Sequence, residues 1–164
     1  MRDTMNKTAQ FIFLILTICT TLAFGAKYPR GCEVKGFGYN ENYLILNDLG
    51  KQTFYLLKNE TDQTIKLKRH ETRDVFMSPS LEAKINPGKW AAFAADIENL
   101  HFNCYFINDN EEETEVACQK VLDICQYPRV KFALSNMGNY WVSTNKPQKR
   151  VIKDAIAKGI LLRW

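Results

Sequence analysis

The stretch HFNCYFINDNEEETEVACQKVLDIC, residues 101–125, contains three of the five cysteines of this 164-residue chain. Segments 101–107 and 114–120 within it have the composition of strands, and the acidic segment 108–113 between them is typical of a solvated turn. The stretch therefore predicts a β-hairpin. Its cysteines fit three roles, as disulfides, metal ligands or a reactive nucleophile, and the compartment of the protein decides among them.

The register of the hairpin predicts one disulfide. Strand side chains alternate between two faces, so Phe102, Cys104 and Phe106 share a face. A turn centred at the middle of the acidic segment places Cys104 opposite Cys118 and Phe106 opposite Val116. Apolar groups then meet apolar groups, and the spacing favours a bridge between the two cysteines.

The N-terminal segment predicts export. A start that carries Arg2 and Lys7 is followed by an apolar run, Phe11–Phe24, and by the small residues Gly25 and Ala26. This is the pattern of a secretory signal peptide, here residues 1–25. An uncleaved membrane anchor is the alternative, but a bilayer span needs roughly 20 apolar residues.

An exported protein reaches an oxidising compartment, so the four cysteines that remain after residue 25 are expected to form disulfides. With Cys104 paired to Cys118, Cys32 pairs with Cys125 by elimination. That bridge closes a loop of roughly ninety residues and, in the chain-entropy model, contributes on the order of 4 kcal/mol. The gaps between these cysteines do not match paired zinc ligands, and C-x-x-C is absent.

The remaining residues, 26–164, fit a single domain that is large enough to bury its own core. Without Arg2, Lys7 and Asp3, the 22 basic and 18 acidic residues become 20 and 17. This small excess of positive charge does not indicate nucleic-acid binding, because such binding needs a concentrated basic face.

A period of two dominates the rest of the domain and predicts short strands separated by turn sequences such as NDLG and NETD. The expected strands, beyond the hairpin, are 43–47, 53–58, 63–69, 89–95, 129–134 and 139–143. Segment 89–95, KWAAFAA, also has a helical composition, but its short length after Pro-Gly favours a strand.

The C-terminal segment predicts one helix that begins near Pro147 and ends before Gly159. Its apolar face consists of Val151, Ile152, Ala155 and Ile156, and should dock on the sheet. Residues 160–162 follow as a short strand or a packed end.

We therefore expect a mainly β protein, an immunoglobulin-like antiparallel β-sandwich with one C-terminal helix. The expected core consists of Leu44, Leu46, Phe54, Leu56, Ile65, Leu67, Trp90, Phe102, Phe106, Phe132 and Leu134, or their alternating neighbours.

No catalytic, metal or cofactor site is expected. A serine hydrolase would need His70 or His101 beside an activated serine, but no G-x-S-x-G setting is present. His101 is three residues from Cys104 and so points to the opposite face of the strand. Consecutive glutamates at the hairpin tip are hydrated together, and they lack the spacing and glycine of an EF-hand.

Two groups of residues are candidates for binding. The first is a basic stripe that includes Lys66, Lys68 and Arg69, together with Lys58 and Arg73; such strand charges also protect an edge from aggregation. The second is the aromatic pair Tyr140 and Trp141 beside a turn, which suits a protein or sugar contact. Alternation predicts that at least one of these two rings is in the core.

Three segments add a resemblance to a known family: KYPRGCEVKGFGYNENYLILN from residue 27, PRVKFALSNMGNYWVSTNK from residue 128 and KGILLRW at the end. They resemble small exported proteins of the enhanced entry protein B type, known from Legionella and its relatives. The resemblance implies a periplasmic or envelope-associated protein linked to host-cell entry or persistence, without an assigned catalytic motif.

Together, these patterns predict a non-enzymatic, periplasmic or secreted protein that acts through contacts with an envelope or host protein. A carbohydrate- or peptidoglycan-binding module is an alternative, and it predicts a line of exposed aromatic residues on one sheet face. A small hydrolase is a further alternative, and it predicts a deep pocket that contains His70 or His101.

Overall fold

The structure is a computed structural model that describes residues 28–37, 42–46, 52–69, 82–95, 100–128, 130–131 and 140–162. The chain divides into two units, Met1–Arg30 and Gly31–Trp164, and the second is described below. The predicted signal peptide, residues 1–25, lies outside the described residues.

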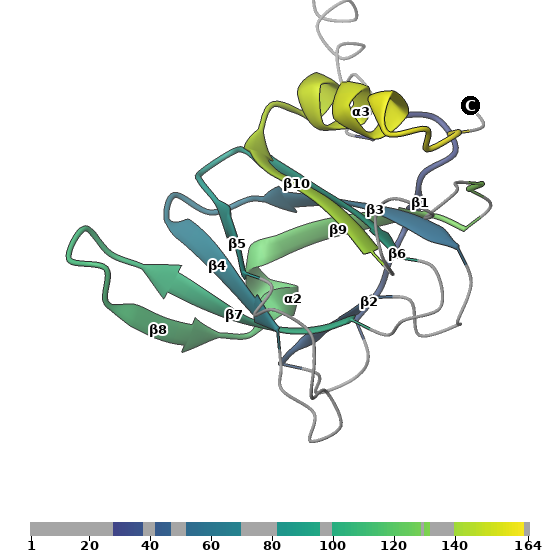
Figure 1. The fold of residues 1–164 in the computed structure, drawn as a ribbon. Coiled ribbons are helices and arrows are strands. Elements are labelled where there is room, and N and C mark those ends of the chain that lie inside the picture. The colour runs from purple at the N-terminus through teal and green to yellow at the C-terminus, as the bar shows by residue number, and fades with distance from the viewer. Residues whose placement is uncertain are drawn as a thin grey trace, which may run out of the picture. The chain divides into compact units, whose positions relative to one another are not determined.

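Within the described part of this unit, the strands form two antiparallel five-stranded sheets (Figure 1). The strand order of sheet A is β1 (Glu33–Val34), β9 (Leu122–Tyr127), β3 (Thr53–Asn59), β6 (Trp90–Ala95) and β10 (Tyr140–Lys146). The order of sheet B is β2 (Leu44–Leu46), β7 (Leu100–Ile107), β4 (Thr64–Arg69) and β5 (Glu82–Ile85), with β8 (Glu113–Val116) beside the second half of β7. The described helices are α2 (Cys118–Val121) and α3 (Gln148–Ala157).

The predicted fold class, an antiparallel β-sandwich with one C-terminal helix, is confirmed. Strands β2, β3, β4, β6 and β7 match predicted strands to within one residue at each end, so KWAAFAA is a strand. The sequence does not predict β5 or β9. Most of the predicted strand 129–134, with Phe132 and Leu134, lies outside the described residues, although Lys131 forms an isolated antiparallel bridge with Leu161.

Strands β7 and β8 form the predicted hairpin, but the predicted register is wrong. Cys104 lies opposite Val116, and Phe106 lies opposite Thr114. The chain leaves the strand after Val116 and turns into α2, and this turn brings Cys118 to Cys104. The disulfide pairs the expected residues, with a Cα–Cα distance of 5.3 Å, although Cys118 is not on a strand.

The turn of this hairpin explains the shifted register. The Asn108 side-chain Oδ1 accepts hydrogen bonds from the backbone N–H groups of Asn110 and Glu112, at 3.0 and 2.9 Å. Glu111 takes a left-handed conformation with φ 61°. An Asn side chain that mimics a backbone turn in this way fixes the position of the turn, so the turn centres one residue earlier than predicted.

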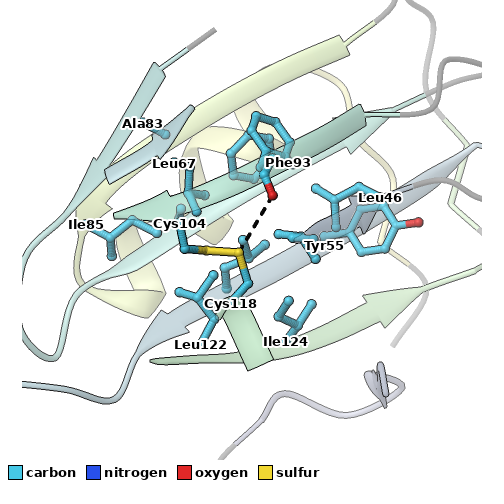
Figure 2. Close-up of a cluster of buried hydrophobic side chains, with 14 of the residues drawn as sticks. Leu46, Tyr55, Leu67, Ala83, Ile85, Phe93, Cys104, Cys118, Leu122 and Ile124 are labelled. Carbon is cyan, nitrogen blue, oxygen red and sulfur yellow. Dashed lines mark hydrogen bonds between the residues drawn. A yellow bond between two sulfur atoms is a disulfide. The ribbon is translucent and has the colours of Figure 1, made fainter. Parts of the chain in front are cut away.

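The space between the two sheets is filled by apolar side chains from both (Figure 2). Leu67 and Ile85 of sheet B face Tyr55 and Phe93 of sheet A in this core, and all four are buried. The Cys104–Cys118 disulfide lies among them. Phe106, predicted as a core residue, is only half-buried and packs at the margin of the cluster, because its neighbour on β8, Thr114, is polar.

The outer face of sheet A is buried as well. Phe54, Leu56 and Cys125 are fully buried there, and the Phe54 ring contacts the ring of Tyr127. Burial raises the pKa of the Tyr127 hydroxyl to about 12. The second disulfide joins Cys125 to Cys32, as predicted, with a Cα–Cα distance of 5.6 Å. The central strands β3 and β6 therefore contribute side chains to two apolar layers.

Helix α3 packs on β6 and β10 of sheet A (Figure 1). Val151 and Ala155 are buried in this contact, which confirms half of the predicted apolar face. The prediction is wrong for Ile156, whose side chain is 52% exposed, because it lies a third of a turn beyond Ala155. None of the helices in the described residues is long and apolar enough to cross a membrane.

A buried amide joins the two sheets at one corner. The Asn59 side chain, at the end of β3, donates to the carbonyl oxygens of Gln63 and Ile85 at 2.7 and 2.8 Å. Its Oδ1 accepts from the backbone N–H and hydroxyl of Thr61, both at 2.8 Å. The amide is fully buried and all its hydrogen-bonding groups are used, so it holds both connections that cross between the sheets at this corner.

Candidate functional site

The basic stripe predicted on β4 lies on the outer face of sheet B, but acidic neighbours neutralise it. The Lys66 ammonium group lies 2.8 Å from a carboxylate oxygen of Glu82 on β5 and 3.1 Å from one of Glu113 on β8. Lys68 also pairs with Glu113, and its Nζ lies 5.2 Å from the centre of the Tyr105 ring. The stripe is therefore part of a mixed-charge ladder that spans four strands.

The ladder stabilises the charged forms of Glu113 and Lys66. Hydrogen bonds from Lys68 and Lys66 lower the pKa of Glu113 below its ordinary value. Hydrogen bonds to Glu82 and Glu113 raise the pKa of Lys66. Glu113 and Lys66 thus keep their charges over a wide pH range. Both lysines already have carboxylate partners. This face is better suited to protecting sheet B than to attracting an anion.

The other members of the predicted stripe do not join this ladder. Lys58 is on sheet A, where its ammonium group lies 2.8 Å from Glu60 and 5.9 Å from the Trp90 ring. Arg69 continues the inward-facing side of β4, after Ile65 and Leu67, and its Nη1 is buried. The prediction that Arg69 shares one stripe with Lys66 and Lys68 is therefore wrong, because alternation puts Arg69 on the other face of β4. Arg73 lies outside the described residues.

The aromatic pair divides between the two faces of β10. Tyr140 packs with Val142 against the core between the sheets. Trp141 and Ser143 point to the other face, toward α3, and line an open cleft. The expectation that one of the two rings packs against the core is met by Tyr140, and Trp141 stays available to a ligand.

The cleft lies between β10 and the second half of α3 and has a volume of about 570 Å³. We call it the β10–α3 cleft; its lining residues are Trp141, Val142, Ser143, Thr144, Lys146, Asp154, Ala157 and Lys158. Four of these are consecutive in β10, so the cleft follows the edge of the strand as well as its side chains. In the described residues, β10 is the last strand of sheet A and pairs only with β6.

A polar cluster holds α3 against β10 at one end of the cleft. The Ser143 hydroxyl donates to Asp154 Oδ2 at 3.0 Å, and the Lys146 ammonium group lies 2.6 Å from the same oxygen. Lys146 also donates to Ser143 Oγ at 3.3 Å, and Arg150 Nε lies 3.4 Å from Asp154 Oδ1. The hydrogen bond from Lys146 and, to a smaller extent, the one from Ser143 lower the pKa of Asp154 below its ordinary value.

This cluster contains a serine and a lysine, but its geometry suits a structural role. A lysine that activates a serine must be neutral and accept the hydroxyl proton. Here Lys146 forms an ion pair with Asp154, and the Ser143 hydroxyl donates its hydrogen bond to that carboxylate. The three groups satisfy one another and fix the orientation of the helix.

Of the two histidine candidates, the structure describes His101 alone, and His101 lies apart from the cleft. His101 is on β7, where its ring stacks on Tyr43 with centroids 6.1 Å apart, and it does not line the β10–α3 cleft. His70 lies outside the described residues. Among the residues that the structure describes, no three His, Cys, Asp or Glu side chains are grouped as metal ligands would be.

Sequence reasoning found Trp141 but missed Ser143, Lys146, Asp154 and Lys158. Alternation along β10 does place Ser143 beside Trp141. The approach of Asp154 depends on the angle at which α3 crosses the strand, for which the sequence carries no signal.

Searches against models of protein families, curated proteins and solved structures each found no match. The resemblance to enhanced entry protein B therefore stays a prediction.

Proposed function

We propose that this protein is a non-enzymatic, exported protein of the bacterial envelope that binds an extended segment of a protein partner in the β10–α3 cleft. The observation that carries the proposal is the cleft itself, which combines the edge of a strand with a tryptophan and a helix wall. Extended peptides bind by adding a strand to such an edge, and neighbouring pockets take alternate side chains.

Two disulfides among the described residues support export, because such bonds persist in oxidising compartments. The N-terminal sequence adds the pattern of a signal peptide. Together, these two features support the proposal of a periplasmic or secreted location. The resemblance to enhanced entry protein B extends the proposal to host-cell entry or persistence.

The observed surface favours a protein partner over a sugar. A carbohydrate-binding module would present a row of exposed aromatic residues on one sheet face. The large hydrophobic residues exposed in the described part of the chain are Val34, Tyr43, Ile156 and Leu161. They include one aromatic ring, and that ring stacks on His101.

Site-specific photocrosslinking in cells that export the protein tests the proposal. A photoreactive phenylalanine analogue at Thr144, in the cleft, is expected to give a discrete adduct with another protein. The same analogue at Lys84, on the outer face of sheet B, should not give that adduct.

A second substitution shows whether the cleft is responsible. Ala157 is exposed and lines the cleft, so Ala157→Trp should fill the cleft and abolish the adduct. Gln119→Trp, at an exposed position of α2, should leave the adduct unchanged. An adduct that survives Ala157→Trp, or no protein adduct at Thr144, would contradict the proposal.

A further inference from the structure

The excess positive charge of the domain is concentrated on α3 and its flanks. Residues 26–164 contain 20 basic and 17 acidic residues. Segment 146–158 contains five of the basic residues and one of the acidic residues. The rest of the domain therefore carries 15 basic and 16 acidic residues and is nearly neutral. The five cations are Lys146, Lys149, Arg150, Lys153 and Lys158.

Three residues of α3 form a stripe that points to solvent. Val151 and Ala155 face the sheet, and the opposite side of the helix carries Lys149, Lys153 and Ile156, at spacings of four and three residues. We call these three residues the α3 stripe. None of them lines the β10–α3 cleft, so the stripe is a separate surface.

The cations of the stripe work against the stability of the helix. Lys149 lies in the first turn, which contains no acidic residue, and a cation there opposes the helix dipole. Lys149 and Lys153 are four residues apart, where like charges repel. Arg150 and Lys146 share Asp154, whereas no described carboxylate pairs with Lys149 or Lys153. The two lysines therefore do not stabilise the fold, and their positions are suited to binding an external anion.

Ile156 indicates which kind of anionic partner fits. Its side chain is 52% exposed among these cations. A soluble polyanion would use the cations only, whereas the surface of an anionic bilayer attracts Lys and Arg and also accepts an apolar side chain among the headgroups. The helix presents a convex surface, which can lie along a flat membrane.

We propose that the α3 stripe docks the exported domain on the surface of an anionic membrane, with Lys149 and Lys153 at the phospholipid headgroups and Ile156 entering between them. This contact is peripheral and reversible, and it leaves the β10–α3 cleft free for a protein segment.

Co-sedimentation of the oxidised, exported protein with lipid vesicles tests the proposal. Vesicles of phosphatidylcholine with about a third phosphatidylglycerol should bind the protein at low salt, and pure phosphatidylcholine should not. High salt should release the protein, because the attraction is screened. Each cation near an anionic bilayer contributes roughly a five-fold gain in binding. Lys149→Ala with Lys153→Ala should therefore weaken binding on the order of 25-fold.

A matched control removes the same net charge elsewhere. Lys84→Ala with Lys120→Ala changes one exposed lysine on sheet B and one on α2, and should leave binding nearly unchanged. Thermal unfolding shows whether a loss of binding comes from a destabilised fold. The α3 double variant should be at least as stable as the wild type, because it removes repulsion and an unfavourable dipole contact.

The Ile156→Ser variant separates a membrane from a soluble polyanion. It should weaken vesicle binding several-fold while the dependence on salt stays the same, because it removes only the apolar contact. Equal losses in both double variants would overturn the proposal, since they would reflect net charge alone. An unchanged Ile156→Ser variant, or stronger binding to soluble polyglutamate than to vesicles, would overturn it in favour of an acidic macromolecule.

Discussion

Strands β3 and β4 follow each other in the chain, but their outward-facing side chains meet opposite environments. On β3, Phe54 and Leu56 point away from the sandwich core and are still fully buried. On β4, Lys66 and Lys68 occupy the equivalent face and form ion pairs with carboxylates at the surface. The two sheets therefore have different roles in one sandwich.

The difference shows that the domain has three layers, in which sheet A lies between α3 and sheet B. A sheet that is covered on both faces has continuous apolar strands, and a sheet with one wet face has alternating strands. TFYLL in β3 and WAAFAA in β6 follow the first pattern, and TIKLK in β4 follows the second. Each proposed binding surface lies on the α3 side of the covered sheet.

The largest expected effect concerns the two disulfides, one for each apolar layer. The Cys32–Cys125 bridge spans 93 residues and the Cys104–Cys118 bridge spans 14. In the chain-entropy model, replacing both cysteines by alanine should lower the free energy of unfolding by about 4.5 kcal/mol for the first pair and about 3 kcal/mol for the second.

Urea denaturation of the two double variants measures this order. Cys104 and Cys118 are fully buried between the sheets, so their removal also leaves a small cavity. If the short bridge turns out to stabilise more than the long one, packing in the sandwich core outweighs loop entropy.

The next effect compares the outer faces directly. Leu56→Ala, on the outer face of sheet A, should lower the free energy of unfolding by about 2–5 kcal/mol, as for other fully buried leucines. Lys66→Ala, on the outer face of sheet B, should cost less than about 1 kcal/mol, because its carboxylate partners stay hydrated. Similar losses in the two variants, measured by denaturant unfolding, would show that the ladder is more than a solvated surface.

The smallest effect concerns the link between α3 and sheet A. The pKa of Asp154 is lowered below its ordinary value of 3.8, so its ion pair stabilises the fold above that pH and loses this effect as pH falls through the lower, folded-state pKa. Asp154→Asn should lower the melting temperature by a few degrees near pH 7 and by less once the pH falls below the folded-state pKa of Asp154. A loss that stays constant over this range would mean that the hydrogen bond to Ser143, and not the charge, is what matters.

The sequence predicts the hairpin of β7 and β8 because its strands and its turn have distinct compositions. It does not predict the register, since several residues of NDNEEE can occupy the turn and the Asn108 hydrogen bonds select one of them. Strand β9 is missed for a related reason. Its residues, LDICQY, follow the predicted second strand of the hairpin almost directly, and the sequence gives no sign that α2 separates the two strands.

The candidate site is predicted only in part. Alternation assigns Tyr140 and Trp141 to opposite faces, but it does not say which face a helix will cover. For the same reason, the basic residues of β4 stand out in the sequence, but their carboxylate partners do not. Glu82 is 16 residues from Lys66, and Glu113 is 45 residues from Lys68. The cations of α3 are visible in the sequence, but their exposure depends on how the helix docks.

The sequence by itself determined the β-class of the domain and its C-terminal helix, because these follow from local periodicity. The predicted cysteine pairs are correct, but the turn into α2, and not the predicted strand register, brings Cys118 to Cys104. Tertiary structure alone decided that sheet A is covered on both faces, that the lysines of β4 are neutralised and that β10 and α3 enclose a cleft. These features depend on contacts between residues distant in the chain, whose geometry is fixed only when the apolar layers pack together.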